Sequence, residues 1–109
     1  MSHIEKSEKL FEVIDVFGHQ VSTTQQYWDK IMLIKHRELD TTIEEVSQVL
    51  EDPNKVRRSI QDPHIKLFYK SFGEKYFVIV VKYINIRGFI VTMYKTSKLK
   101  QKGEIVWSK

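Results

Sequence analysis

Cations, hydroxyl groups and aromatic rings recur at alternate positions in two apolar stretches of the C-terminal half. Because side chains of a β-strand point alternately to its two faces, residues 75–83 and 88–95 can be sorted by parity. One parity contains Tyr76, Val78, Val80 and Lys82, followed by Ile90, Thr92, Tyr94 and Thr96. Such a face suits single-stranded RNA, because bases stack on Tyr rings and phosphates pair with Lys. The same residue types also occupy solvated sheet faces simply because they favour strands, so both interpretations stay open.

The opposite parity predicts the core of these two strands. It contains six apolar residues, namely Phe77, Ile79, Val81, Phe89, Val91 and Met93. Two amphipathic helices earlier in the chain are their natural partners, because a sheet buries an apolar face against another layer.

The first helix is predicted to begin near Gln25, with Thr23 or Thr24 as its cap, and to end around His36. Its apolar face follows three-and-four spacing. The residues of this face are Trp28, Ile31, Met32, Ile34 and Lys35.

The second helix is predicted to open at Asp40 or Thr41, with Glu44 three residues beyond Thr41 in capping-box register. Asp52-Pro53 ends it, since the residue before a proline avoids helical geometry. Its buried stripe is Ile43, Val46, Val49 and Leu50.

Beyond Asn54 the hydrophobic period changes to two. Strands are predicted at Ile65–Phe72, Lys75–Tyr83 and Gly88–Lys95, with shorter ones at Lys55–Ser59 and Glu104–Trp107 and a weak hairpin within residues 10–23. The predicted fold class is α+β, in one domain of residues 1–109: two N-terminal helices on a twisted antiparallel sheet of about four strands, with an N-terminal hairpin. Residues 1–9 are expected to be flexible.

Charge is distributed unevenly along the chain. Residues 1–52 carry 5 Lys and Arg against 11 Asp and Glu, a net charge of −6, whereas residues 53–109 carry 13 against 3, a net charge of +10. A basic half suits contact with a polyanion, because neutralising phosphates releases counterions. A merely solvated basic face is the alternative.

The composition narrows the remaining function classes. With no Cys there is no disulfide framework or thiolate metal site, and the four His have no short ligand spacing, so no metal or other cofactor is expected. The longest apolar run, Phe77 to Val81, is far too short to cross a bilayer. We therefore expect a cytoplasmic protein without a membrane partner.

Several blocks occur in an order that resembles a known superfamily. They are Ile34–Leu39, Leu50–Ser59, Leu67–Lys70, Val80–Lys82 and Gly88–Thr96. In this order they resemble the phage-type branch of the barnase, EndoU, colicin and RelE superfamily of ribonucleases, and they are also similar to the BrnT toxins. The resemblance runs from Tyr27 to about Ile105. It implies a RelE- or barnase-like fold, and an enzyme that cleaves RNA without metal by attack of the ribose 2′-hydroxyl on the adjacent phosphate.

The resemblance also implies site residues. Those with catalytic roles are His36, Arg57, Lys82, Thr92 and Tyr94, and those expected to bind RNA are Arg58, Ser59, Tyr69, Lys70, Lys95 and Thr96. His36 would act as base or acid, Arg57 would clamp phosphate oxygens, and Lys82 would supply a point charge. Structural roles compete with these: His36 can simply close a helix, Tyr69 can be core, and Ser59 can form a turn.

Three hypotheses follow for the function. The leading one is a metal-independent ribonuclease of toxin type, whose cationic face an acidic antitoxin protein would cover. The second is a noncatalytic module that binds RNA or an acidic protein on the same face. The third is a purely structural protein, with neither RNA affinity nor activity.

Overall fold

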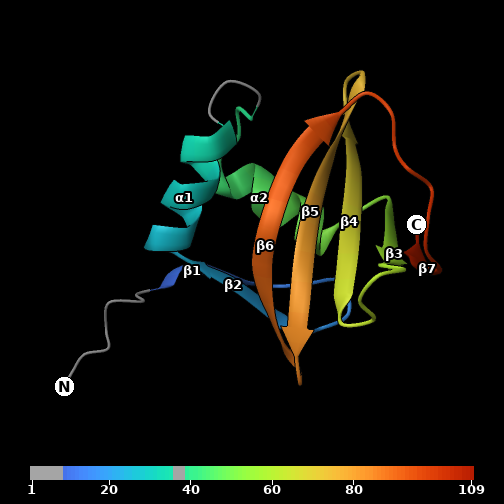
Figure 1. The fold of residues 1–109 in the computed structure, drawn as a ribbon, viewed down its shortest axis with the longest axis horizontal. Helices are drawn as coiled ribbons and strands as arrows, with labels where there is room; N and C mark the ends of the chain where they lie inside the picture. The colour runs from blue at the N-terminus through green and yellow to red at the C-terminus, as the bar shows by residue number, and fades with distance from the viewer. Residues whose placement is uncertain (1–8, 36–38) are drawn as a thin grey trace.

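Within residues 9–35 and 39–109, which this computed structural model describes, seven strands form one mixed, open sheet with two helices packed on one face (Figure 1). Residues 1–8 of the expected flexible start and the predicted catalytic His36 lie outside the described residues. The class is α+β as predicted, but the sheet is larger than four strands. The strands are β1 Lys9–Ile14, β2 Gln20–Thr24, β3 Lys55–Arg58, β4 Ile65–Phe72, β5 Lys75–Ile84, β6 Arg87–Thr96 and β7 Ile105–Ser108, and the helices are α1 Gln25–Lys35 and α2 Ile43–Glu51.

Strands β4, β5 and β6 form the antiparallel centre of the sheet, in the order β1-β2-β6-β5-β4-β3-β7. They are rich in β-branched and aromatic residues, which pack well on a pleated surface. Gly73, with φ of 63°, allows the tight turn between β4 and β5. All five strands predicted after Asn54 are confirmed to within one residue at either end.

The predicted N-terminal hairpin is also confirmed, with β1 and β2 antiparallel across a turn containing Gly18. The sequence did not indicate that β2 would join the central sheet by running parallel to β6, with Val21 opposite Gly88. A Cβ on Gly88 would lie 2.8 Å from a side-chain atom of Val81 and 2.9 Å from one of Tyr83. Glycine there lets the strands approach beneath these side chains, and the prediction of a wholly antiparallel sheet was wrong.

Helix α1 begins where the hairpin ends, because the Thr24 hydroxyl accepts the N–H of Tyr27 at 3.1 Å and so caps the helix. Ile31 is buried, and Trp28 packs edge-on against Phe11 with ring centroids 5.9 Å apart. Ile34, predicted on the apolar face, is instead 72% exposed. The narrow hairpin covers less of α1 than a full apolar stripe would need.

Helix α2 is capped by Thr42, whose hydroxyl accepts the N–H of Glu45 at 3.2 Å. The predicted cap at Asp40 or Thr41 and the capping box were therefore wrong by one or two positions. The predicted stripe is confirmed at Val46, Val49 and Leu50, all fully buried.

A β-bulge in β6 reverses the predicted inside–outside pattern at the start of that strand. The extra residue is Val91, because Val81 pairs with Ile90 whereas the residue before Val81 pairs with Thr92. As a result Ile90 is 2% exposed in the core, and Phe89 is 43% exposed on the other face. The prediction of Phe89 as core and of Ile90 on the functional face was wrong for this reason.

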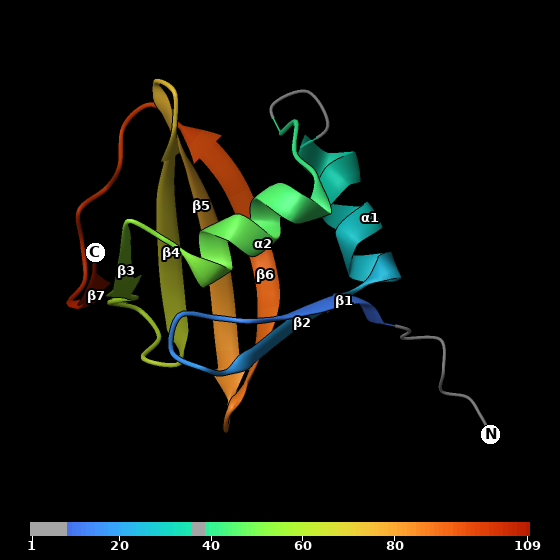
Figure 2. The ribbon, with the colours of Figure 1, turned by 180° about the vertical axis from the view of Figure 1, so that it is seen from behind.

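We call the sheet face opposite the helices the open face. Seen from behind, α2 and the β1–β2 hairpin lie in front of the central strands and α1 lies beside β6, so the open face is turned away (Figure 2). Residues 97–104, which we call the strap, connect β6 to β7 across the sheet. Near the end of the strap, Gly103 has a φ of 93°, and a Cβ there would lie 2.0 Å from the carbonyl oxygen of Arg58, so that only glycine fits.

Candidate nucleic-acid interface

Five predicted site residues share the open face. The strand register places Arg57, Leu67, Val80 and Thr92 in one row across β3, β4, β5 and β6, and Lys55, Tyr69, Val78 and Tyr94 in the next row. Lys82 lies two residues beyond Val80 on the same face. The faces predicted from the alternation of side chains are therefore confirmed for β5 and for the part of β6 beyond the bulge.

Arg57 has a structural role in this arrangement. Its side chain is buried, with 8% exposed, and its Nη1 donates to the carbonyl oxygen of Gly103 at 2.8 Å. It therefore fastens the strap to the sheet. Two strands separate it from Thr92, a distance of about 14 Å at the usual strand spacing. Arg57 and Thr92 cannot grip the same phosphate directly.

Two pockets flank the strap and share Tyr69. One, of about 330 Å³, is lined by Asn54, Lys55, Arg57, Tyr69, Ser71, Tyr76, Leu99 and Gln101. The other, of about 210 Å³, is lined by Ser59, Ile60, Gln61, Leu67, Tyr69, Tyr94, Lys100 and Lys102. We call them the outer and inner strap pockets. Each combines Lys with Tyr, the chemistry that holds phosphates and stacks bases.

The tyrosine hydroxyls of the inner strap pocket remain hydrogen-bond donors at neutral pH. Burial raises the pKa of Tyr69, with the neighbouring Tyr94 adding to the effect, and burial likewise raises the pKa of Tyr94. Lys100 and Lys102 lie in the same pocket, and none of the ion pairs among the described residues engages them. The pocket thus offers positive charge to an anion.

Lys82 stands apart from the strap pockets. Its Nζ lies 3.5 Å from Oδ2 of Asp62, and it lines a separate, mostly apolar pocket of about 430 Å³ together with Phe89 and Tyr27. The proposed grouping of Lys82 with Arg57 is therefore not seen, although both lie on the open face.

Two predicted RNA-binding lysines lie on the helix side. Lys70 and Lys95 both flank Phe77 in the register, whose ring faces the helices. Lys70 donates to the carbonyl oxygen of Asp52 at 2.7 Å, and Lys95 to that of Asp40 at 2.6 Å. They fasten the helical layer to the sheet. Neighbouring residues of a strand face opposite ways, so Lys70 and Lys95, expected to bind RNA, lie on the other side of the sheet from Tyr69 and Tyr94.

Ser59 and Thr96 reach the open face at its edges. Ser59 lines the inner strap pocket, and its Oγ accepts the N–H of Gln61 at 3.2 Å. At the start of the strap, the Thr96 hydroxyl donates to the carbonyl oxygen of Lys98 and accepts the backbone N–H of Lys98. Both hydroxyls organise turns, and Ser59 alone of the two lines a pocket here.

The structure brings together a cluster of His, Arg, Lys and Tyr residues that the sequence analysis did not predict. A pocket of about 210 Å³ at the end of the sheet is lined by His19, Arg58, Pro63, His64, Lys66, Tyr83 and Asn85; we call it the His64 pocket. His19 and His64 lie 45 positions apart, so no local sequence pattern connects them. The placement of His64 just before a strand was the only available signal.

A buried acid lies behind this pocket. Asp15 is 4% exposed, and its Oδ1 accepts the backbone N–H groups of Phe17 at 2.8 Å and His19 at 2.9 Å. Its Oδ2 accepts the hydroxyl of Tyr83. Burial and the bond to Asp15 raise the pKa of Tyr83 far above its usual value, so the phenol stays neutral.

Among the described residues, no group of three or more His, Cys, Asp or Glu is placed to hold a metal ion. None of the helices described is both long and apolar enough to cross a membrane.

Comparison of the chain with protein-family models, with curated proteins and with solved structures gives no match. The resemblance to the ribonuclease superfamily therefore stays a prediction based on the sequence blocks.

Proposed function

We propose that this protein is a metal-independent ribonuclease of toxin type that holds single-stranded RNA on the open face of its sheet. The observation that supports it is the inner strap pocket, where Tyr69, Tyr94, Lys100 and Lys102 converge. The half-buried Tyr94 presents a ring for stacking, and none of the ion pairs among the described residues engages the two ammonium groups, a combination that suits a nucleotide. Tyr69 is only 4% exposed, so it has the core position that the sequence left open. The RelE- or barnase-like fold is part of the same proposal.

The cleavage step needs a base for the ribose 2′-hydroxyl, an acid for the leaving 5′-oxygen, and cations near the phosphate. As the 2′-oxygen forms its bond to phosphorus, the bond to the 5′-oxygen breaks and a cyclic phosphate remains. In this proposal His36, as the resemblance implies, accepts the proton of the 2′-hydroxyl and then donates it to the leaving 5′-oxygen, and the strap lysines stabilise the negative charge on the phosphate oxygens. An acidic antitoxin segment would inhibit by covering the same lysines.

The test is cleavage of total RNA by the purified chain in EDTA. Wild type is expected to cleave, and His36→Ala to lose activity by about 10²–10⁴-fold while still binding RNA. The double variant Lys100→Gln, Lys102→Gln is expected to weaken RNA binding. Lys75→Gln, an exposed lysine at the β4–β5 turn, is the control. Undiminished cleavage by His36→Ala would remove the assignment of the base.

A specific observation favours a second function, noncatalytic RNA binding. Neither His19 nor His64 lines the two strap pockets, and Arg57 already bonds to Gly103. Without His36 close by, the open face would bind RNA but lack a proton acceptor. Salt-sensitive binding with no cleavage at any protein concentration would establish this function in place of the first.

A further inference from the structure

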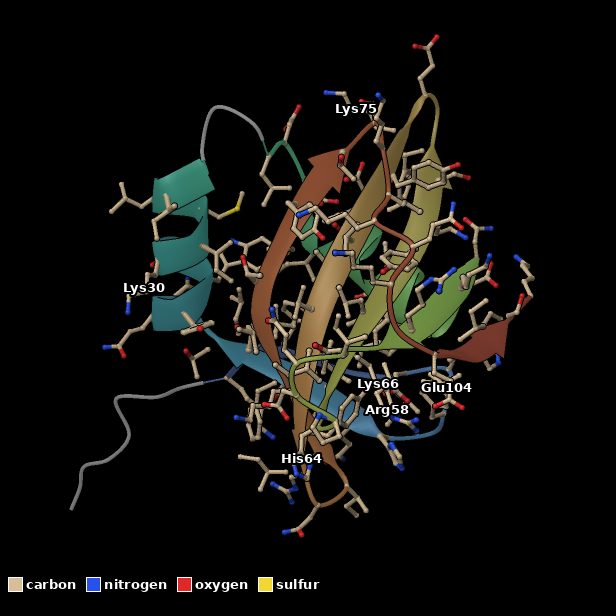
Figure 3. All side chains as sticks on the ribbon, turned by 45° about the vertical axis from the view of Figure 1, so that its right-hand side comes forward. Lys30, Arg58, His64, Lys66, Lys75 and Glu104 are labelled. Atoms are coloured by element: carbon tan, nitrogen blue, oxygen red, sulfur yellow. The ribbon has the colours of Figure 1, made fainter. Side chains whose placement is uncertain are left out.

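Basic side chains from three separate segments meet at one end of the sheet. Arg58 comes from β3, Lys66 from β4 and His64 from the connection between them, and all three line the His64 pocket. Figure 3 shows these three at the same end of the molecule, with Lys30 and Lys75 far from them. Nothing in the proposed RNA site on the open face uses this cluster.

Two of these cations oppose each other directly. Arg58 pairs with Lys66 in the antiparallel register, so their side chains leave adjacent strands on the same face. Residues opposed in this way have Cα atoms only about 5 Å apart, and like charges there destabilise a sheet. An anion placed between the two cations would relieve this repulsion.

Lys66 is held in place rather than free to leave. Its Nζ lies 4.1 Å from the centroid of the Phe17 ring and 4.7 Å from that of Tyr83. Burial lowers the pKa of Lys66, and Arg58 lowers it further, while the charge of Asp15 opposes this. The two rings attract the ammonium group, but the carboxylate of Asp15 is buried and none of the ion pairs among the described residues engages Lys66.

The carboxylates near the His64 pocket differ in their burial and in the partners that they already have. Asp15 is buried, and its oxygens are already bonded to two backbone N–H groups and to Tyr83. Asp62 contacts Lys82 and the backbone of His64. Among the carboxylates of the described residues, Glu104, on the strap and 69% exposed in its side chain, is the one that pairs with Arg58. Such an exposed pair is weak and can be exchanged for another anion.

We propose that the His64 pocket binds a phosphate group, which replaces the carboxylate of Glu104 on the guanidinium of Arg58. Arg58 grips two phosphate oxygens, Lys66 supplies the second charge, and the imidazole of His64 closes the open side. The ligand class is a phosphate oxyanion, whether that of a free nucleotide or of an RNA backbone. The site does not depend on cleavage at the open face.

The first test is titration of ¹⁵N-labelled protein with inorganic phosphate at constant ionic strength, followed by NMR. Saturable shifts are expected at Arg58, His64 and Lys66. Arg58→Gln should weaken binding by about tenfold, as expected for loss of a charged hydrogen-bond pair. Glu104→Gln should tighten it severalfold, because the competing carboxylate is gone. Lys30→Gln and Lys75→Gln should change nothing.

Two results would overturn the proposal. One is shifts that do not saturate; the other is phosphate affinity in Glu104→Gln no greater than in wild type. The second is decisive even if Arg58→Gln folds poorly, because Glu104 is exposed.

A second arm identifies the source of the phosphate. If it comes from RNA, Arg58→Gln weakens binding of a short RNA as well as of inorganic phosphate; if it comes from a mononucleotide, RNA binding is unchanged. A protein that cleaves RNA but does not bind inorganic phosphate would contradict this site and leave the proposed function intact. A protein that binds phosphate at this pocket but does not cleave RNA would contradict the proposed function and leave this site intact.

Discussion

At the scale of single residues, the hydroxyl of Tyr83 donates a hydrogen bond to the buried carboxylate of Asp15. Tyr83→Phe removes the donor to Oδ2 and leaves that oxygen buried. We expect a loss of about 1–3 kcal/mol in the free energy of unfolding, the usual cost of an unsatisfied buried group. Urea unfolding at pH 7 measures it. Tyr27→Phe, on the exposed side of α1, is the control and should change little.

The same variant gives a dependence on pH. The pKa of Tyr83 is raised in the folded protein, above the value of about 10 in the unfolded chain. The stabilisation from Tyr83 is therefore complete below pH ~10 and falls as the pH rises further, because only the unfolded chain then ionises. The difference in stability between wild type and Tyr83→Phe should shrink between pH 10 and 11. A constant difference would contradict the assigned bond.

At the scale of elements, the strap depends on Gly103. Gly103→Ala should move the strap off the sheet, because the added Cβ would collide with the carbonyl oxygen of Arg58. We expect weaker RNA binding together with a loss of stability of about 1–3 kcal/mol. Gly73→Ala is the matched control, since Gly73 also has a positive φ but its Cβ would meet nothing within 4 Å. Equal losses of RNA binding in both variants would mean that the strap does not form the site.

The elements also show which features a sequence can predict. Strand β4 was predicted residue for residue because its alternating pattern lies between clear turn signals. The bulge was not, because Phe89, Ile90 and Val91 are three apolar residues in a row and fit either parity. The pairing of β2 with β6 depends on residues more than 60 positions apart, and no local pattern specifies such a contact.

The candidate site follows the same division. Alternation within single strands was enough to place Lys82 and Tyr94 on one face, whereas it left a core position open for Tyr69. It could not show that the strap would cover Arg57, nor that two distant turns would bring His19 and His64 together. Both outcomes depend on how separate elements pack, which local periodicity does not encode.

At the scale of the whole molecule, the lysines of the basic half differ in whether a carboxylate lies close to them. On the helix side, Lys95 lies 3.5 Å from Glu45, and Lys70 and Lys109 lie 3.3 Å and 3.0 Å from carboxylate oxygens of Asp52. The acidic helical segment therefore takes up part of the positive charge. The strap lysines Lys98, Lys100 and Lys102 have no such carboxylate among the described residues. The positive charge left for a polyanion therefore includes the strap beside the open face.

This asymmetry predicts how RNA binding depends on salt. Changing the three strap lysines to Gln should reduce the slope of log K against log salt by about 2, since each phosphate contact to a single strand contributes about 0.7. Changing Lys70, Lys95 and Lys109 to Gln alters the net charge by the same amount on the helix side, and the slope should stay unchanged. Binding to an RNA oligonucleotide, measured by fluorescence anisotropy from 50 to 300 mM salt, compares the two. Equal reductions would mean that RNA responds to the overall charge rather than to the strap.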